Sequence, residues 1–246
     1  FKKERQELDE NAGNVVKNLI HANNALSSVE GEWSNDLLLL SAKNICESHD
    51  DKNGGFTTAP KFPSPMKIDF LLAIRESQSI RTNQKLANQI DHSIKTTLTK
   101  MASGGIYDQI GGGFFRYSID EKWHIPHFEK MLYDNALLLS SYSRAYQRFK
   151  SSIYKEKVEQ TIHWLIRKMT DEDGGFFSSV NADNEEGEGE YYFWQYEELK
   201  KILEKDNFQK FVDAYCISES SSLENGKSLP ILKNDFQNDS MSFDSI

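Results

Sequence analysis

The stretch GGIYDQIGGGFFRYSIDEKWHIPHFEKMLYDNALLLSSYSRAY, residues 104–146, sets the pattern that the rest of the chain follows. Its first half combines five glycines with aromatic and charged residues, and glycine is unfavourable inside helices and strands. We therefore predict a shaped loop there. The second half begins at Pro126, which suits a first helical position, and continues with apolar residues at helical spacing. A loop that leads directly into a long helix is a rigid mount for a functional site.

A pair of glycines follows a predicted helix three times, at Gly54, Gly104 and Gly174. The spacing of apolar residues predicts helices over 5–22, after Ser34, from Pro65, over 86–101, from Pro126, over 154–169, near 199–203 and near 208–215. Repeated pairs of amphipathic helices predict an all-α, α/α architecture with an inner and an outer layer. Residues 176–180 and 190–194 are predicted to pair as a short β-hairpin with an acidic tip.

Composition narrows the classes of partner. The chain has 246 residues and a net charge of −9, which argues against nucleic acid. No apolar run approaches the roughly 20 residues that cross a bilayer, so we expect no membrane span. The two cysteines, Cys46 and Cys216, form no CxxC pair and fit reduced thiols, which predicts a cytoplasmic protein.

Four segments carry a resemblance to a known family. They are APKFPSP (59–65), GGIYDQIGGGFFRYSIDEKW (104–123), PHFEKMLYDNA (126–136) and GGFFSSVNADNEEGEGEYYFW (174–194). They resemble the YyaL-like, spermatogenesis-associated, thioredoxin-domain-containing family. The resemblance implies an incomplete (α/α)6 toroid of the six-hairpin glycosidase type, related in fold to N-acylglucosamine 2-epimerases. It also implies a thioredoxin-like domain as a partner in full-length members, which lies outside this sequence.

The expected organisation is then a lead-in helix at 1–30, a partial α/α toroid at 31–216 and a polar, irregular tail at 217–246. Two positions depart from the family pattern. Phe115 stands where the family has histidine, and Asn181 stands where it has aspartate. The chain therefore lacks an imidazole and a carboxylate that could each serve as an acid or a base. This argues against assigning a catalytic role of the family directly to these loops.

The candidate catalytic residues are His127, Glu129, Asp134 and Asp183. A neutral His127 could abstract or return a sugar proton with Glu129 or Asp134 as its partner. The alternative is that His127 and Glu129 only satisfy the start of the predicted helix and brace the glycine loop.

The candidate substrate-binding residues are Tyr107, Asp108, Arg116, Trp123 and Trp194. Asp108 and Asp120 flank Arg116, so they could be a glycosidase carboxylate pair or a structural ion-pair network. The aromatic residues could be platforms for sugar rings or parts of the core.

Metal binding is the weaker interpretation of the remaining polar residues. Asp183, Glu188 and Glu190 lie at a loop tip, where solvated charge is the usual reading. Pro126 places a turn between His124 and His127, which keeps them from sharing an ion in a continuous helix. We therefore predict neither a metal ion nor a cofactor.

The leading hypothesis is a carbohydrate-handling toroid that binds a sugar-like small molecule, with hydrolysis or epimerisation as candidate reactions. Its pocket is expected where the three glycine loops converge. One alternative is a non-catalytic binding or scaffold module that serves a thioredoxin-like domain. Another is a redox-linked enzyme whose thiol chemistry lies in that domain.

Overall fold

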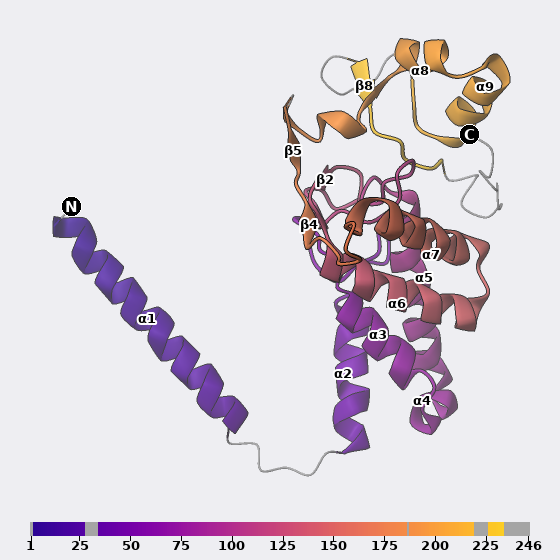
Figure 1. Cartoon of the computed structure of the whole chain (residues 1–246). Helices are drawn as coiled ribbons and strands as arrows, with labels where there is room; N and C mark the ends of the chain where they lie inside the picture. The colour runs from indigo at the N-terminus through magenta and orange to yellow at the C-terminus, as the bar shows by residue number, and fades with distance from the viewer. Residues whose placement is uncertain (1, 28–33, 186, 219–225, 234–246) are drawn as a thin grey trace. The chain divides into compact units, whose positions relative to one another are not determined.

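The computed structural model describes residues 2–27, 34–185, 187–218 and 226–233, and the chain divides into two compact units, Phe1–Leu37 and Leu38–Ile246 (Figure 1). The first unit contains helix α1 (Lys2–Ser27), which confirms the predicted helix over 5–22. Its large apolar side chains are exposed: Leu8, Val15, Val16, Leu19 and Ile20. Helix α2 (Asn35–Glu47) begins after Ser34, whose Oγ accepts a hydrogen bond from the backbone N–H of Leu37 at 3.3 Å, as a helix cap does.

The second unit is mainly helical. Pro65 is the first residue of its first complete helix, as predicted. The helices are α3 (Pro65–Ile74), α4 (Gln78–Thr82), α5 (Gln84–Ser103), α6 (Leu132–Phe149), α7 (Ser152–Trp164), α8 (Tyr196–Ile202) and α9 (Lys205–Ala214). A short π-helical segment, Leu165–Met169, continues α7.

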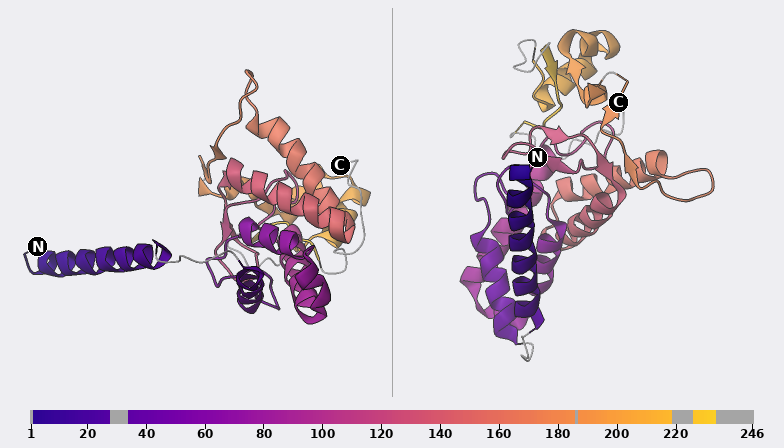
Figure 2. Two further views of the ribbon diagram at one scale, coloured as in Figure 1. Left: turned by 90° about the horizontal axis from the view of Figure 1, so that it is seen from below. Right: turned by 90° about the vertical axis from the view of Figure 1, so that its left-hand side faces the viewer.

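Four of these helices form two layers. Helix α6 packs against α3 and α7, and α5 packs against the same two helices. The four lie side by side in the views of Figures 1 and 2. Helices α3 and α6 are thus neighbours in one layer, and α5 and α7 are neighbours in the other, which is how successive hairpins pack in an α/α toroid. The prediction of a mainly helical fold with short β-hairpins is confirmed, and the paired layers agree with the predicted incomplete toroid.

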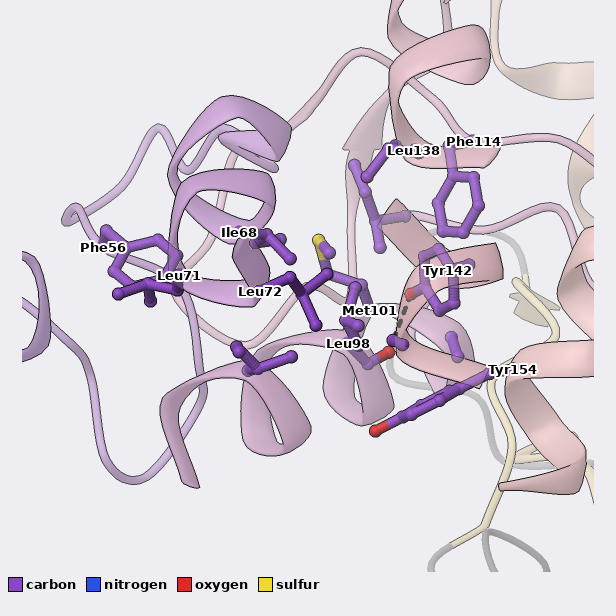
Figure 3. Close-up of a cluster of buried hydrophobic side chains, with 14 of the residues drawn as sticks. Phe56, Ile68, Leu71, Leu72, Leu98, Met101, Phe114, Leu138, Tyr142 and Tyr154 are labelled. Carbon is purple, nitrogen blue, oxygen red and sulfur yellow. Dashed lines mark hydrogen bonds between the residues drawn. The ribbon is translucent and has the colours of Figure 1, made fainter. Parts of the chain in front are cut away.

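The main core lies between these layers. Tyr142 on α6 is 1% exposed, stacks on Phe114 and donates a hydrogen bond from its hydroxyl to the carbonyl of Leu98 on α5 at 2.7 Å (Figure 3). Leu72 on α3 and Leu138 on α6 belong to the same cluster. A second, smaller cluster joins α8 and α9 through Leu199, Phe208 and Phe211.

The predicted helix start at Pro126 is wrong. Strand β2 (Pro126–His127) pairs with β1 (Tyr117–Ser118), β3 (Lys130–Met131) follows, and α6 begins at Leu132. The carboxylate of Asp120 explains the turn, because it accepts hydrogen bonds from the backbone N–H groups of His124 and Ile125, the shorter at 2.6 Å. The chain therefore folds back into a hairpin before the helix starts.

The predicted pairing of 176–180 with 190–194 is also wrong. Strand β4 (Ser179–Val180) pairs with β3 instead, and β7 (Trp194–Gln195) pairs with β8 (Lys227–Ser228). The acidic tip forms its own hairpin from β5 (Asp183–Asn184) and β6 (Gly187–Glu188), which a positive φ of 128° at Gly187 permits. A 3-10 turn at Glu190–Tyr192 follows.

The predicted tail therefore contains a strand and a buried leucine, Leu229, at 6% exposure. Residues 219–225 and 234–246 of that tail lie outside the described residues. The predicted boundaries at 30/31 and 216/217 stay predictions.

Candidate functional site

The three glycine loops meet at one end of the helices. Trp123 of the central loop donates from Nε1 to the carbonyl of Asn53 in the first loop at 2.9 Å. Lys61, after the first loop, exchanges backbone hydrogen bonds with Ser118. The loop after Gly174 joins the central loop through the β3–β4 pair. These connections bring side chains of the central loop close to side chains of the loop after Gly174.

His127 is the centre of the polar group at this end. Its Nδ1 lies 2.7 Å from Oε1 of Glu188, and its Nε2 lies 3.9 Å from Oε2 of Glu129. The ring stacks on Tyr117, with centroids 5.0 Å apart, and 27% of the side chain is exposed. The short contact to Glu188 favours the proton on Nδ1, which leaves Nε2 as the acceptor. Glu188 faces Nδ1 of the ring and Glu129 faces Nε2. A single metal ion bound to one of these nitrogens could therefore not be ligated by both glutamates in this arrangement.

Glu129 is held by Arg116. The guanidinium Nη1 lies 2.9 Å from Oε2 of Glu129, and the backbone N–H of Arg116 donates to the carbonyl of Glu129 at 2.9 Å. The hydrogen bond between the two side chains raises the pKa of Arg116. The expected network of Arg116 with Asp108 and Asp120 is wrong, because Arg116 pairs with Glu129 instead.

Asp134 lies in the first turn of α6, and its Oδ2 is buried with no hydrogen-bond partner among the described residues. Burial raises the pKa of this carboxyl to about 6, while Arg116 lowers the pKa and Glu129 raises it further. Asp134 therefore exchanges a proton near neutral pH, as a general acid or base must. Exposed Tyr133 precedes it and adjoins Arg116.

Two predicted sugar platforms belong to the core. Tyr107 is 1% exposed and donates its hydroxyl proton to Gln160, and Trp123 is 0% exposed. Neither presents a ring face to a ligand in this structure. Trp194 is half-buried against the second core cluster.

The predicted acids Asp108 and Asp120 support the central loop. Asp108 contacts the buried amine of Lys130 at 2.7 Å and accepts backbone hydrogen bonds from Ile110 and Gly111. Asp120 holds the turn before β2. A role for this pair as glycosidase carboxylates is therefore disfavoured. Asp183 is exposed on β5, opposite Glu188 in the hairpin register, and its catalytic role stays a prediction.

Sequence reasoning missed two features of the site. Glu188, considered there only for metal binding, is the partner of His127 across a long sequence separation. Lys130, which is 1% exposed, is enclosed by the rings of Phe115, Trp164 and Tyr192. Phe115 itself is fully buried, so the position where the family has histidine lies in the core here. Side-chain contacts of this kind have no periodic signal in a sequence.

Comparisons with known proteins now bear on this arrangement. No protein-family model matches the chain. Spermatogenesis-associated protein 20 of Homo sapiens is 40% identical over 163 residues, which are 64% of this chain and 20% of that protein. An uncharacterized protein of Caenorhabditis elegans, B0495.5, is 35% identical over 211 residues, 82% of this chain and 28% of that protein.

Over the 163 matched residues the chain is a homologue of spermatogenesis-associated protein 20. The family resemblance seen in the sequence is therefore confirmed, and the relatives belong to a thioredoxin-domain family. The chain spans about a fifth of the length of spermatogenesis-associated protein 20.

Among solved structures, cellobiose 2-epimerase from Bacillus thermoamylovorans has a TM-score of 0.42 and 15% identity, over 60% of this chain and 42% of that one. A sugar epimerase from a ruminal bacterium has a TM-score of 0.46 and 12% identity, over 65% and 43% of the two chains. At these scores the likeness says nothing about the activity of this chain. Within the described residues, no helix is long and apolar enough to reach across a bilayer.

Proposed function

We propose that this chain binds a sugar-like small molecule at the end where the glycine loops meet, and that His127 transfers a proton there. The observation that carries the proposal is the contact of His127 Nδ1 with Glu188 at 2.7 Å, because it leaves Nε2 as the basic atom of a partly exposed imidazole. A carboxylate that accepts from one ring nitrogen also stabilises the imidazolium once the other nitrogen takes up a proton.

The groups around His127 supply the rest of a proton-transfer site. Asp134, whose pKa is raised to about 6 by burial, can hold or release a second proton near neutral pH. The pair formed by Arg116 and Glu129 offers a guanidinium for a developing oxyanion or a hydroxyl. Exposed Tyr133 offers a ring face to the apolar side of a sugar. This set favours removal of a proton next to a sugar carbonyl, the step that sugar epimerisation requires.

Hydrolysis is the second reaction that the same residues support. Glycosidases need one protonated and one ionised carboxyl group on either side of the scissile bond. Asp134, with its raised pKa, would be the acid, and Glu129, which is paired with Arg116, would be the base or nucleophile.

Deuterium incorporation tests the proton-transfer step without the need to know the product. The chain is incubated with a panel of reducing sugars and uronates in deuterated water, and loss of the proton next to the carbonyl is followed by proton NMR. His127→Gln should abolish exchange, and Glu188→Gln should slow it about tenfold or more, within the range of general acid–base contributions. His163→Gln, on the exposed face of α7, is the matched control and should exchange at the rate of the original chain.

Ligand-observed NMR with the same panel separates binding from chemistry. Binding that Tyr133→Ala weakens, without any exchange, would favour the alternative of a non-catalytic binding module. The burial of Tyr107 and Trp123 and the structural use of Asp108 are the observations that favour that alternative. Absence of both binding and exchange would refute the proposal.

A further inference from the structure

A second group of ligating side chains lies at the root of the first glycine loop, outside the His127 site. His49 and Asp51 belong to the segment after α2, and His92 belongs to α5. Among the described residues, these three offer one ligand atom each within 4.8 Å of one another, and they are the group of histidine, cysteine and carboxylate side chains that could hold a metal ion.

The geometry centres on the carboxylate. Oδ1 of Asp51 lies 3.0 Å from Nδ1 of His49 and 3.4 Å from Nε2 of His92. The two imidazole rings are 5.6 Å apart and nearly perpendicular, at 84°. Ligand bonds of about 2.0–2.2 Å place the ligand atoms of a tetrahedral zinc site about 3.4 Å apart. Both distances to Asp51 are close to that value, and the ligand nitrogens of His49 and His92, which lie within 4.8 Å of each other, would have to approach by at most about 1.4 Å.

The backbone that carries the ligands is held in place. The N–H of Gly55 donates to Oγ1 of Thr97 on α5 at 2.9 Å. A Cβ added at Gly54 would meet Cα of Thr97 at 2.7 Å, so the loop lies directly on the helix. Asp50, between the two ligands of this segment, is fixed by Lys61 at 2.7 Å. The backbone of the loop that carries His49 and Asp51 is therefore fixed against α5, which carries His92, without an ion.

The side chains combine one fixed ligand with two adjustable ones. His49 is 1% exposed, whereas His92 and Asp51 are 56% and 85% exposed. The second nitrogen of His92 lies 3.5 Å from the hydroxyl of Thr96, a contact that orients the ring. Nε2 of His49 is buried with no partner among the described residues. Nε2 has no hydrogen-bond partner whether it carries the ring proton or not. Binding of a metal ion at Nδ1 therefore leaves no further buried polar atom without a partner.

Two imidazoles and one carboxylate are the ligand set of zinc sites that keep a fourth position for water, and of related first-row divalent sites. We propose that His49, Asp51 and His92 bind a first-row divalent metal ion, with Zn²⁺ as the favoured ion, and that the ion fastens the first glycine loop to α5. Two exposed ligands leave the remaining position open to solvent. The sequence analysis predicted no metal, and this site departs from that prediction.

Zinc binding by the whole chain tests the proposal. Isothermal titration with ZnCl2, on protein without an affinity tag, should give one site that His92→Gln and Asp51→Asn each weaken about tenfold or more, the scale that even an orienting residue around a metal reaches. Both replaced residues are exposed, so the variants should fold, which far-ultraviolet circular dichroism would verify. His163→Gln and His127→Gln are matched controls and should bind zinc as the original chain does.

Cobalt identifies the ligands directly. Co²⁺ in the same site should give visible absorption bands of a nitrogen- and oxygen-ligated ion, and His92→Gln should remove them. A spectrum dominated by thiolate charge transfer would assign the binding to Cys46 or Cys216 and overturn the proposal. Unchanged zinc affinity in His92→Gln and Asp51→Asn, or no zinc binding by the original chain, would overturn it as well.

Discussion

Replacement of Asp134 by asparagine should stabilise the protein at alkaline pH. The carboxyl group is half-buried, its Oδ2 has no hydrogen-bond partner among the described residues, and burial raises its pKa from 3.8 to about 6. An acid whose pKa is higher in the folded state resists ionisation there. The folded protein therefore loses stability as the pH rises through 6, and it regains that stability as the pH falls toward 4.

The size of the effect follows from the shift. A change of one pKa unit corresponds to about 1.4 kcal/mol, so a shift from 3.8 to about 6 would amount to about 3 kcal/mol in full. Because Asp134 is only half-buried, solvent screens part of this cost, and we expect a gain of about 1 kcal/mol for Asp134→Asn at pH 8. At pH 4 the folded carboxyl group is protonated, but the unfolded one, with a pKa of 3.8, is still about 60% ionised, so the gain should fall to a few tenths of a kcal/mol.

Urea denaturation at pH 8 and at pH 4 measures both values. Asp183→Asn, on the exposed β5–β6 hairpin, is the control and should change the free energy of unfolding by less than about 0.5 kcal/mol at either pH. A loss of stability in Asp134→Asn at pH 8, or an equal gain at both pH values, would refute the reasoning. The same variant should lose deuterium exchange if Asp134 serves the proposed reaction, which would make it a site where stability and activity oppose each other.

Three further substitutions test the packing. Gly54→Ala should destabilise the chain by about 2 kcal/mol or more in urea denaturation, because φ is +74° and the added Cβ would meet Thr97 at 2.7 Å; an unchanged midpoint would mean that the loop moves freely on α5. Tyr142→Phe should cost about 1 kcal/mol in the same assay, since it removes the buried hydrogen bond from the hydroxyl to the carbonyl of Leu98, and a neutral result would count against that hydrogen bond. Phe115→His should cost roughly 2–4 kcal/mol by thermal unfolding, because it puts a polar ring in a fully buried position beside a buried ammonium group, and no loss would show that the core tolerates the family residue.

The helices could be predicted from the sequence because their signals are local. Ser34 caps α2 and Pro65 opens α3, as their positions predicted. Pro126 gives the same signal, but it does not begin a helix, because Asp120 turns the chain back by accepting hydrogen bonds from the backbone N–H groups four and five residues ahead. A proline at the start of a helix and a proline in a short edge strand give the same signal in the sequence. Only the turn held by Asp120 distinguishes them here.

The candidate site could be predicted only in part. His127, Glu129 and Asp134 lie close together in the sequence and were named, together with Arg116. Glu188, which decides the proton position on His127, comes from another loop. Aromatic residues of the glycine loop were expected at a cavity, but Trp123 fills space between two loops, and composition cannot separate those two uses.

The two-residue ladders between the loops have a consequence for how this protein can diverge. Peptide groups, which every residue but proline carries in full, make the connections between Lys61 and Ser118 and between β3 and β4. Side-chain contacts such as those of Trp123 with Asn53 and of His127 with Glu188 therefore add to these backbone connections and are not their sole source. Substitution of Arg116, Tyr117 or His127 should therefore alter the chemistry of this end while the backbone pairing between the loops persists.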